Sequence, residues 1–542
     1  MISGVNASFG NHNSVANGGV LFLIPALISQ GLITIKETHT IREGYYKLES
    51  IILTLAIMAL CRIKNPEQLK NCSPGELGKL IGLDRVPEVK CLREKLDELF
   101  SNNTTKLLNE KLAQQWIETN QDNLLLYTDG HVKIYNGQKA NLTKKFISRQ
   151  KLCLPATTDF WLNDEQGLPL MVWTGELSEK LQNMIEYKII PDLLSAKLIT
   201  QDDNTSNKPI CTLVFDREAY EPAFFARLWQ TYRIAIITYR KNVKDMWAEN
   251  DFEKIEIEDD LKNKTTMLLG EKEIELNNFK FREIRRLNSR EHQTAIITTH
   301  PHLDTKTIAL SMFKRWQQEN YFKYMIADYN IDHITQYGIE HIDLESQVVN
   351  PEYRSITYQI KKEKEKLQRM KAKLLQKITL TNQETIDKIK ENIETKAVLV
   401  EQIELKEIVL KSFVLKREGI PKKIKLSEMS DEKRYNKLQT ESSYFMSTIK
   451  MICYRAETVV ANLLDGKYSR YIEEKRMLIK NIISTPIDLN PDYTNKTLTV
   501  TLHTLSTPKA NELAGKIAIE LNNTETIFPG TELKMIFKSV AY

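Results

Sequence analysis

The sequence predicts an α/β core with a β-rich insertion, flanked by helical segments and by a long helical hairpin. Two observations lead to this prediction. Between residues 124 and 240, short apolar runs typical of buried strands alternate with stretches of helical periodicity. Farther along, residues 386–414 keep apolar side chains at alternating spacings of three and four, as in a helix that packs lengthwise against another helix.

The composition of the 542-residue chain, 42% hydrophobic and 27% charged, excludes a disordered tail protein, a collagen-like chain and a disulfide mini-scaffold. At about 150 residues per domain, the length favours three or four domains. The net charge of +5 is small for this length, so any argument for a nucleic-acid partner must come from local clusters. The predicted segments are a helical N-terminal domain (1–118), an α/β core with an insertion at about 242–297 (119–350), a basic helical hairpin arm (351–420) and a C-terminal helical and β-α-β domain (421–542).

The cysteines and the apolar runs bear on the compartment. Six cysteines are scattered without a C-x-x-C pair, which gives neither a zinc site nor a disulfide framework and fits a reducing cytoplasm. Residues 1–19 lack the basic start of a secretory signal. The apolar runs at 20–28 and 51–60 fall short of the ~20 residues that span a bilayer. We therefore expect a soluble, intracellular protein without a membrane partner.

Within the helical N-terminal segment, Ser73, Pro74 and Glu76 form the pattern of a capping box with proline in the first turn. This pattern predicts a short helix that stops near Gly82, followed after a tight turn by a second helix from Pro87. Two such helices form either a DNA-binding helix-turn-helix or an ordinary helical hairpin, and the sequence favours neither.

The core segment begins with NLLLYTDGHVKIYNG (123–137), which predicts a strand, a turn at Asp129-Gly130 and a second strand. CTLVFD (211–216) and RIAIITYR (233–240) are typical of buried strands, and the helix EPAFFARLWQT separates them. A helical stretch is expected at 178–198. Antiparallel strands are expected in the insertion at 242–297, and a helix follows over 304–327.

The arm segment combines a basic cluster with a coiled-coil pattern. Residues 361–377 hold eight Lys or Arg and two Glu, a net of +6. Thr381 and Glu384 predict a second capping box, which opens the next helix. The predicted seam of that helix consists of Ile386, Ile389, Ile393, Lys396, Val400, Ile403, Glu407, Leu410 and Val414. The lysines of the arm form either a solvated face or a phosphate-binding surface.

Three acids stand out by position. Asp129 follows the strand NLLLYT, Asp216 ends the strand CTLVF, and Glu319 lies in the helix MFKRWQQENYFKYM. Acids at the carboxyl ends of buried strands lie where α/β sheets bind ligands. Mg²⁺ takes a few carboxylates together with phosphate oxygens and water, and two such ions clamp the attacking and leaving oxygens of a phosphoryl transfer. The structural alternative is turn capping for the two aspartates and an ion-pair ladder of Arg315, Glu319 and Lys323.

The contexts of these acids, YTDGHVKIYNG, VFDREAY and RWQQENYFKY, together resemble DDE transposases of bacterial insertion sequences. The likeness is closest to the group whose third carboxylate lies in an Arg-x-x-x-Glu helix and follows a β-rich insertion. GGVLFLIPAL and ELGKLIGLDR near the N-terminus, and NPEYR, IKMICYRAET and FPGTEL farther along, extend the likeness over most of the chain.

The resemblance implies a ribonuclease-H-like core in which Asp129, Asp216 and Glu319 hold two Mg²⁺ ions, with Mn²⁺ able to substitute. Such enzymes cut the inverted-repeat ends of their own element and join the freed 3′-hydroxyl to target DNA. The implied partners are double-stranded transposon-end and target DNA, bound by a homodimer or higher oligomer at the bacterial nucleoid in the cytoplasm. The N-terminal helices and the arm would grip the ends and pair the protomers. The expected DNA contacts are Arg315, Lys323, Lys361, Lys362, Lys364 and Lys366.

The chain departs from the group's signature at two positions, where Met312 replaces a tyrosine and Ile326 replaces a lysine. Two other functions stay open: a non-catalytic DNA-binding or scaffolding relative, and a stand-alone ribonuclease-H-like nuclease. The intact acidic trio favours a transposase over the first, and the arm and C-terminal segment favour it over the second. His131 and the His300-Pro301-His302 stretch are weaker site candidates.

Overall fold

The computed structural model describes residues 4–540 except for 43, 118–123, 139, 148–149, 176–178, 201–206, 259–263, 333–337, 341, 380–385, 432–433 and 465–471. The chain forms two compact units. The first comprises residues 1–137, 142–338 and 438–542, and the second comprises 138–141 and 339–437.

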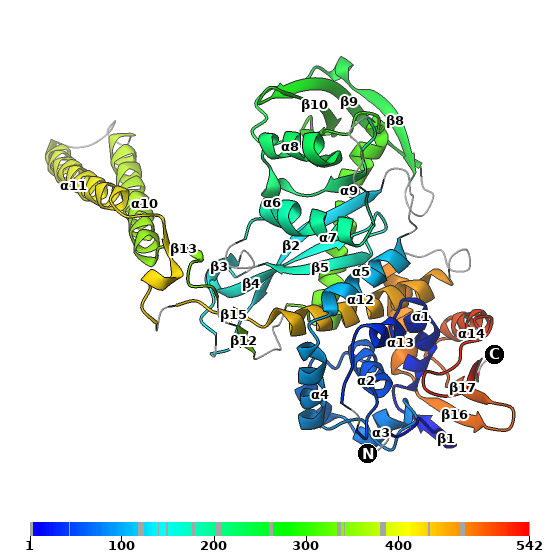
Figure 1. Ribbon diagram of the computed structural model, residues 1–542. Helices are drawn as coiled ribbons and strands as arrows, with labels where there is room; N and C mark the ends of the chain where they lie inside the picture. The colour runs from blue at the N-terminus through cyan, green and yellow to red at the C-terminus, as the bar shows by residue number, and fades with distance from the viewer. Residues whose placement is uncertain are drawn as a thin grey trace. The chain divides into compact units, whose positions relative to one another are not determined.

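A ten-stranded sheet forms the centre of the first unit (Figure 1). Across the sheet its strands are β3 (Lys144–Ile147), β4 (Leu152–Asn163), β2 (Leu125–Ile134), β6 (Cys211–Val214), β7 (Ile234–Tyr239), β11 (Gln293–Thr298), β10 (Phe279–Leu287), β9 (Lys264–Leu276) and β8 (Glu253–Glu258), with β5 (Pro169–Gly175) also paired to β4. β2 pairs antiparallel with β4 but parallel with β6, and β6 pairs parallel with β7. The sheet is therefore mixed, with both parallel and antiparallel pairs of strands.

The turn predicted at Asp129-Gly130 is wrong, because β2 continues through both residues. β4 pairs with β2 from Tyr127 to Ile134, so the long-range partner keeps the chain extended where the local Asp-Gly signal favours a turn. A Cβ at Gly130 would lie 3.4 Å from Phe160, so this position suits a residue without a side chain.

The insertion is β-rich, as predicted, but it extends the central sheet and does not form a separate one. β11 pairs with β7, and the antiparallel strands β10, β9 and β8 follow in order. Asn277 and Asn278, which join β9 to β10, have φ values of 52° and 60°. Two successive left-handed residues are the requirement of a type I′ hairpin turn, and asparagine tolerates them well.

Helices pack on both sides of this sheet. α9 (Thr305–Tyr329) begins where the sequence predicts, with the Asp304 side chain accepting a hydrogen bond from the Thr307 amide at 2.9 Å. The other helices of this region are α6 (Leu181–Met184), a π-helical turn (Ile185–Ile189), α7 (Ile190–Ser195) and α8 (Pro222–Tyr232).

The N-terminal helices are α1 (Ile24–Ser29), α2 (Leu48–Leu60), α3 (Pro74–Lys79), α4 (Val89–Ser101) and α5 (Thr105–Trp116). Ser73 caps α3 by accepting from the Glu76 amide, as predicted. Residues 80–88 join α3 to α4, so the connection is longer than the expected tight turn. A Cβ at Gly78 would lie 2.6 Å from the Arg85 backbone, which shows that this connection folds back onto α3.

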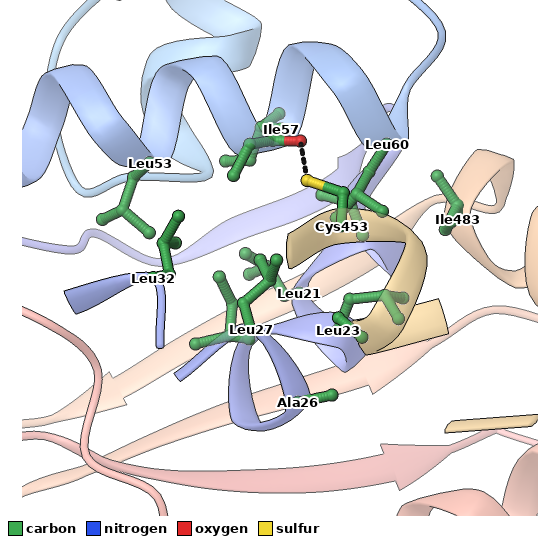
Figure 2. Close-up of a cluster of buried hydrophobic side chains, with 14 of the residues drawn as sticks. Leu21, Leu23, Ala26, Leu27, Leu32, Leu53, Ile57, Leu60, Cys453 and Ile483 are labelled. Atoms are coloured by element: carbon green, nitrogen blue, oxygen red, sulfur yellow. Dashed lines mark hydrogen bonds between the residues drawn. The ribbon is translucent and has the colours of Figure 1, made fainter. Parts of the chain in front are cut away.

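The N-terminal and C-terminal segments share one hydrophobic core, although the sequence predicts separate domains for them. In Figure 2, Leu27 and Ile57 lie in the same cluster as Cys453 and Ile483. The strand β1 (His12–Val15) also joins the C-terminal sheet by pairing with β16. The C-terminal elements are α12 (Thr440–Asn462), α13 (Ile472–Ser484), β16 (Ile487–Asp492), β17 (Thr497–Leu502), α14 (Pro508–Asn522) and β18 (Lys534–Ser539). β17 and β18 are parallel around α14, which confirms the predicted β-α-β tail.

The second unit contains the helical hairpin. α10 (Pro351–Thr379) packs against α11 (Ile386–Glu418), and β13 (Gln347–Val349) pairs with β14 (Lys423–Lys425) at its base. Ion pairs join the helices between Lys406 and Glu363 at 2.6 Å and between Lys371 and Glu407 at 2.7 Å.

The predicted seam of α11 agrees with burial in part. Ile403 is buried and Leu410 and Val414 are half-buried, but Val400 is exposed and Leu399 takes its place on the inner face. The predicted cap at Thr381 and Glu384 lies outside the described residues, as do the side chains at 386–394. Among the described residues, no helix is long and apolar enough to span a bilayer.

A buried ionic network ties α2, α9, α12 and α13 together in the first unit. Glu457, which is 1% exposed, accepts from Arg62 at 2.7 Å, from Arg476 at 3.3 Å and from the Tyr324 hydroxyl at 2.8 Å. Arg62 also pairs with Asp328 on α9 at 3.3 Å. A carboxylate buried to this extent needs several charged donors, since each ion loses its hydration.

We expect Glu457→Gln to lower the free energy of unfolding by about 3–5 kcal/mol, because Arg62 and Arg476 each lose a buried ion pair. Chemical denaturation followed by circular dichroism measures this loss. The matched control is Glu532→Gln, which breaks an exposed ion pair with Lys496 and should leave the free energy of unfolding nearly unchanged. Equal losses in both variants would contradict the role given to the network.

Candidate functional site

Helix α9 is held against β2 on both sides of Arg315. The Tyr127 hydroxyl donates to the Ser311 carbonyl at 3.0 Å. The Gln318 amide donates to the Tyr127 carbonyl at 3.4 Å and to Asn163 Oδ1 at 3.1 Å. Because Ser311 and Gln318 lie on either side of Arg315 along the helix, these contacts direct Arg315 toward Asp129.

The three acids singled out in the sequence surround the guanidinium of Arg315. Its nitrogens lie 2.7 Å from Glu319 Oε1, 3.5 Å from Asp129 Oδ2 and 3.9 Å from Asp216 Oδ2. The arginine side chain is only 14% exposed. Residues from two strand regions and one helix, far apart in the chain, therefore converge on one cation.

The structural roles considered for these acids also exist. Asp129 Oδ1 accepts from the Gly130 amide at 2.8 Å, and Asp216 caps a short helical turn by accepting from the Arg217 amide at 2.7 Å. Glu319 pairs with Arg315 one turn earlier. Asp129 and Asp216 still direct their second carboxylate oxygens toward the shared guanidinium, so local capping does not account for the convergence of these two acids.

The charge around Asp129 is not fully balanced. Burial raises the pKa of Asp129 to about 6; Arg315 opposes the shift, and the carboxylates of Glu218 and Asp216 add to it. A half-buried carboxyl that resists ionisation is typical of sites that bind a cation or transfer protons, although ion-pair networks also show it.

Glu218 is a fourth carboxylate that sequence reasoning missed. Its Oε2 lies 3.6 Å from the position that a Cβ of Gly130 would take, next to Asp129. Burial raises the pKa of Glu218, with Lys145 opposing the shift and Asp216 adding to it. The Asp-x-Glu spacing of residues 216–218 was the available signal, but an acid two residues away is common in a chain with 71 acids.

The two departures from the family signature face hydrophobic cores. Met312 is fully buried between α9 and the sheet, and Ile326 packs against the large core of the first unit. A tyrosine at position 312 would have to bury its hydroxyl group, so Met312 fits the packing of α9, and half-buried Ile326 adds an apolar contact with the core. Lys323, one turn beyond Glu319, is exposed.

The histidines of the sequence analysis have structural partners. The ring of His131 stacks on Phe322, with centroids 5.2 Å apart, and its Nε2 lies 2.5 Å from Asp332 Oδ1. His300 Nδ1 accepts from the Leu303 amide at 2.9 Å, and burial lowers the His300 pKa to about 4. In the described part of the chain, no three His, Cys, Asp or Glu side chains are close enough to hold a metal ion as they stand.

Within the second unit, the four lysines predicted to contact DNA lie on α10. Lys361, Lys362 and Lys364 are exposed. Lys366 is also exposed, but it pairs with Glu363 at 2.7 Å, so part of its charge is already balanced. The geometry leaves the first three as the most accessible cations of the predicted set.

A family model described as "Transposase protein" matches residues 2–541. The chain belongs to this transposase family. Membership implies an enzyme that binds and processes DNA. No curated protein and no solved structure matches the chain.

We expect the transposase variant Asp129→Asn to gain stability at neutral pH. Because the folded protein binds the Asp129 proton more tightly than the unfolded chain does, stability falls as the pH rises from about 4 through 6. Asparagine removes this cost. The free energy of unfolding of the variant should therefore exceed that of the wild-type protein by about 1–3 kcal/mol at pH 7.5 and equal it at pH 4.

Urea denaturation at the two pH values measures the difference. The control is Asp97→Asn, which changes an exposed aspartate on α4. Its free energy of unfolding should differ little from that of the wild-type protein at either pH. A gain for Asp129→Asn that does not depend on pH would refute the electrostatic cause.

Proposed function

We propose that this protein is a DDE transposase that binds the inverted-repeat ends of its own element, cuts them and joins the 3′-hydroxyl to target DNA. The observation that carries the proposal is the convergence of Asp129, Asp216 and Glu319 around Arg315. The mixed sheet with an antiparallel part, a parallel part and a β insertion before α9 supports a ribonuclease-H-like core.

The donor set fits hard divalent cations. Asp129, Asp216 and Glu319 offer carboxylate oxygens, which Mg²⁺ and Mn²⁺ prefer, and they are too few to complete a shell without phosphate or water oxygens. On this proposal these three residues hold two Mg²⁺ ions. Bound metal supplies charge stabilisation to the attacking and leaving oxygens of the phosphoryl transfer.

On this proposal Arg315 has two roles: it pairs with the carboxylates in the absence of DNA and binds a phosphate when DNA arrives. In this structure its guanidinium pairs with the three carboxylates, so loading a metal ion requires the arginine to turn toward another anion. A DNA phosphate is such an anion, and arginine binds it through paired hydrogen bonds. Arg315 thus links the arrival of DNA to the release of the carboxylates, and exposed Lys323 adds a further phosphate contact.

The remaining contacts with DNA are assigned to the arm. Lys361, Lys362, Lys364 and Lys366 lie in the +6 stretch of α10, and exposed lysines attract the phosphate backbone irrespective of sequence. We place the protein at the bacterial nucleoid on this ground, as a homodimer or higher oligomer on double-stranded DNA.

We expect purified protein to cleave double-stranded DNA carrying the inverted repeats that flank its gene, with Mg²⁺ or Mn²⁺ present. Asp129→Ala, Asp216→Ala and Glu319→Ala should each lower cleavage by at least about a hundredfold, because each removes a carboxylate from the site. Strand transfer is read from the same gels as joined target products.

Retained DNA affinity in the three variants shows that folding and binding survive. The matched control is Glu525→Ala, which removes an exposed carboxylate that pairs with Lys534. Cleavage that persists in one of the acid variants removes that residue from the site. Binding without cleavage by the wild-type protein would favour the non-catalytic DNA-binding alternative.

We expect neutralisation of the arm lysines to weaken DNA binding and to flatten its salt dependence. Each lost phosphate contact lowers the slope of log K against log salt by about 0.9. Fluorescence anisotropy over a salt titration measures both quantities. The variant replaces four lysines by glutamine: Lys361, Lys362, Lys364 and Lys366.

The control variant removes the same number of positive charges from the C-terminal segment, where each lysine is paired with a glutamate. Its substituted residues are Lys496, Lys509, Lys516 and Lys534. If the two variants lose affinity and salt dependence equally, the arm has no special part in binding DNA.

A further inference from the structure

Helix α11 carries an exposed apolar stripe along its outer face. The side chains of Val398, Leu405, Ile408, Val409 and Leu415 are between 39% and 68% exposed. Of the described helices, none exposes as many large apolar side chains. A soluble surface seldom leaves such a run uncovered, so the stripe indicates a contact that the single chain does not make within this unit.

The spacing of the stripe is that of a second seam. Val398, Leu405 and Ser412 follow one another at intervals of seven, and so do Glu401, Ile408 and Leu415, offset by three. At about 100° per residue this stripe lies opposite the inner face, where Ile403 and Leu410 pack toward α10. Helix α11 therefore has two apolar faces on opposite sides: an inner face toward α10 and an exposed outer face.

The charges beside the stripe favour a second copy of the same helix. Glu404 and Lys411 are exposed on one edge of the stripe. When two α11 helices run antiparallel with Leu405 opposite Ile408 of the partner copy, Val398 lies opposite Leu415 as well. Glu404 of each copy then lies two residues, about 3 Å along the axis, from the level of Lys411 of the other. The charges are thus self-complementary, and the Glu404–Lys411 pair between the copies occurs twice by symmetry.

Glu401 and Ser412 fix the register of this arrangement. In the same alignment Glu401 faces Ser412 of the other copy, so the polar residues of both seams meet at the same levels. A shift of one heptad in one direction would place the Glu401 carboxylate against Leu405, and a shift in the other direction would move it past the end of the partner helix. Polar residues within a seam are known to select register in this way, at some cost in stability.

We infer that two copies of this chain associate through the outer faces of α11, antiparallel and centred between Leu405 and Ile408. The inference goes beyond the proposed function, because it names the surface and the orientation and needs neither metal nor DNA. It also leaves α10 outside the interface, since α10 packs on the opposite side of α11.

The test measures the mass of the full-length protein in solution without DNA, by sedimentation velocity over a range of concentrations. We expect a wild-type dimer and a monomeric Ile408→Glu variant. Ile519→Glu is the matched control, because it places the same charge at an exposed isoleucine on α14 and should leave the dimer intact. A monomeric wild-type protein, or an Ile408→Glu variant that stays dimeric, overturns the inference.

Charge reversal tests the orientation. Glu404→Lys and Lys411→Glu should each weaken the dimer at least tenfold at low salt, and the double variant should restore it, because the opposed charges are exchanged together. A parallel pair does not oppose these residues, so single variants without effect, or a double variant without recovery, would exclude the antiparallel pairing. Unchanged circular dichroism and thermal melting show that the substitutions leave the fold intact.

Discussion

The candidate site depends on the buried carboxylate of Glu457, because this group fixes the far half of α9. Glu457 receives Arg62 from the end of α2, Tyr324 from α9 and Arg476 from α13, all within 3.3 Å. The near half of α9 is held independently by the hydrogen bonds between Tyr127 and the helix. Arg315 and Glu319 lie near the hydrogen bonds to Tyr127, so both the sheet and the ionic network determine where they lie.

The site itself is a balance of like charges. Asp129, Asp216 and Glu319 share one guanidinium, and Glu218 adds a fourth carboxylate beside Gly130. One guanidinium cannot neutralise the three carboxylates that it faces, and the raised pKa of Asp129 reflects burial together with the nearby negative charge of Glu218 and Asp216. Such a site is destabilising for the folded chain by itself, which is the cost expected of carboxylates that hold a cation, as proposed above.

Sequence reasoning found the acids but not how they are brought together. Asp129, Asp216 and Glu319 were recognisable from their local contexts, and the strands and α9 from their periodicity. The Asp129-Gly130 turn was wrong because β4, more than twenty residues away, pairs through it. Glu218 was missed because its importance arises from the closeness of Gly130 across the sheet. The shared core of Leu27 and Cys453 was equally invisible, since apolar periodicity predicts that a face is buried but not what covers it.

The outward faces of the two arm helices differ in chemistry, which the composition of the whole arm segment does not show. Its two helices pack against each other through one face each, and Ile360 and Leu367 of α10 and Ile403 of α11 are buried there. The outward face of α10 is then basic and that of α11 apolar, which makes them different surfaces of one hairpin. A phosphate backbone lowers its energy only on the first, and an apolar partner only on the second. On the two proposals above, the arm holds DNA and a second copy at the same time, because neither contact buries the residues that the other needs.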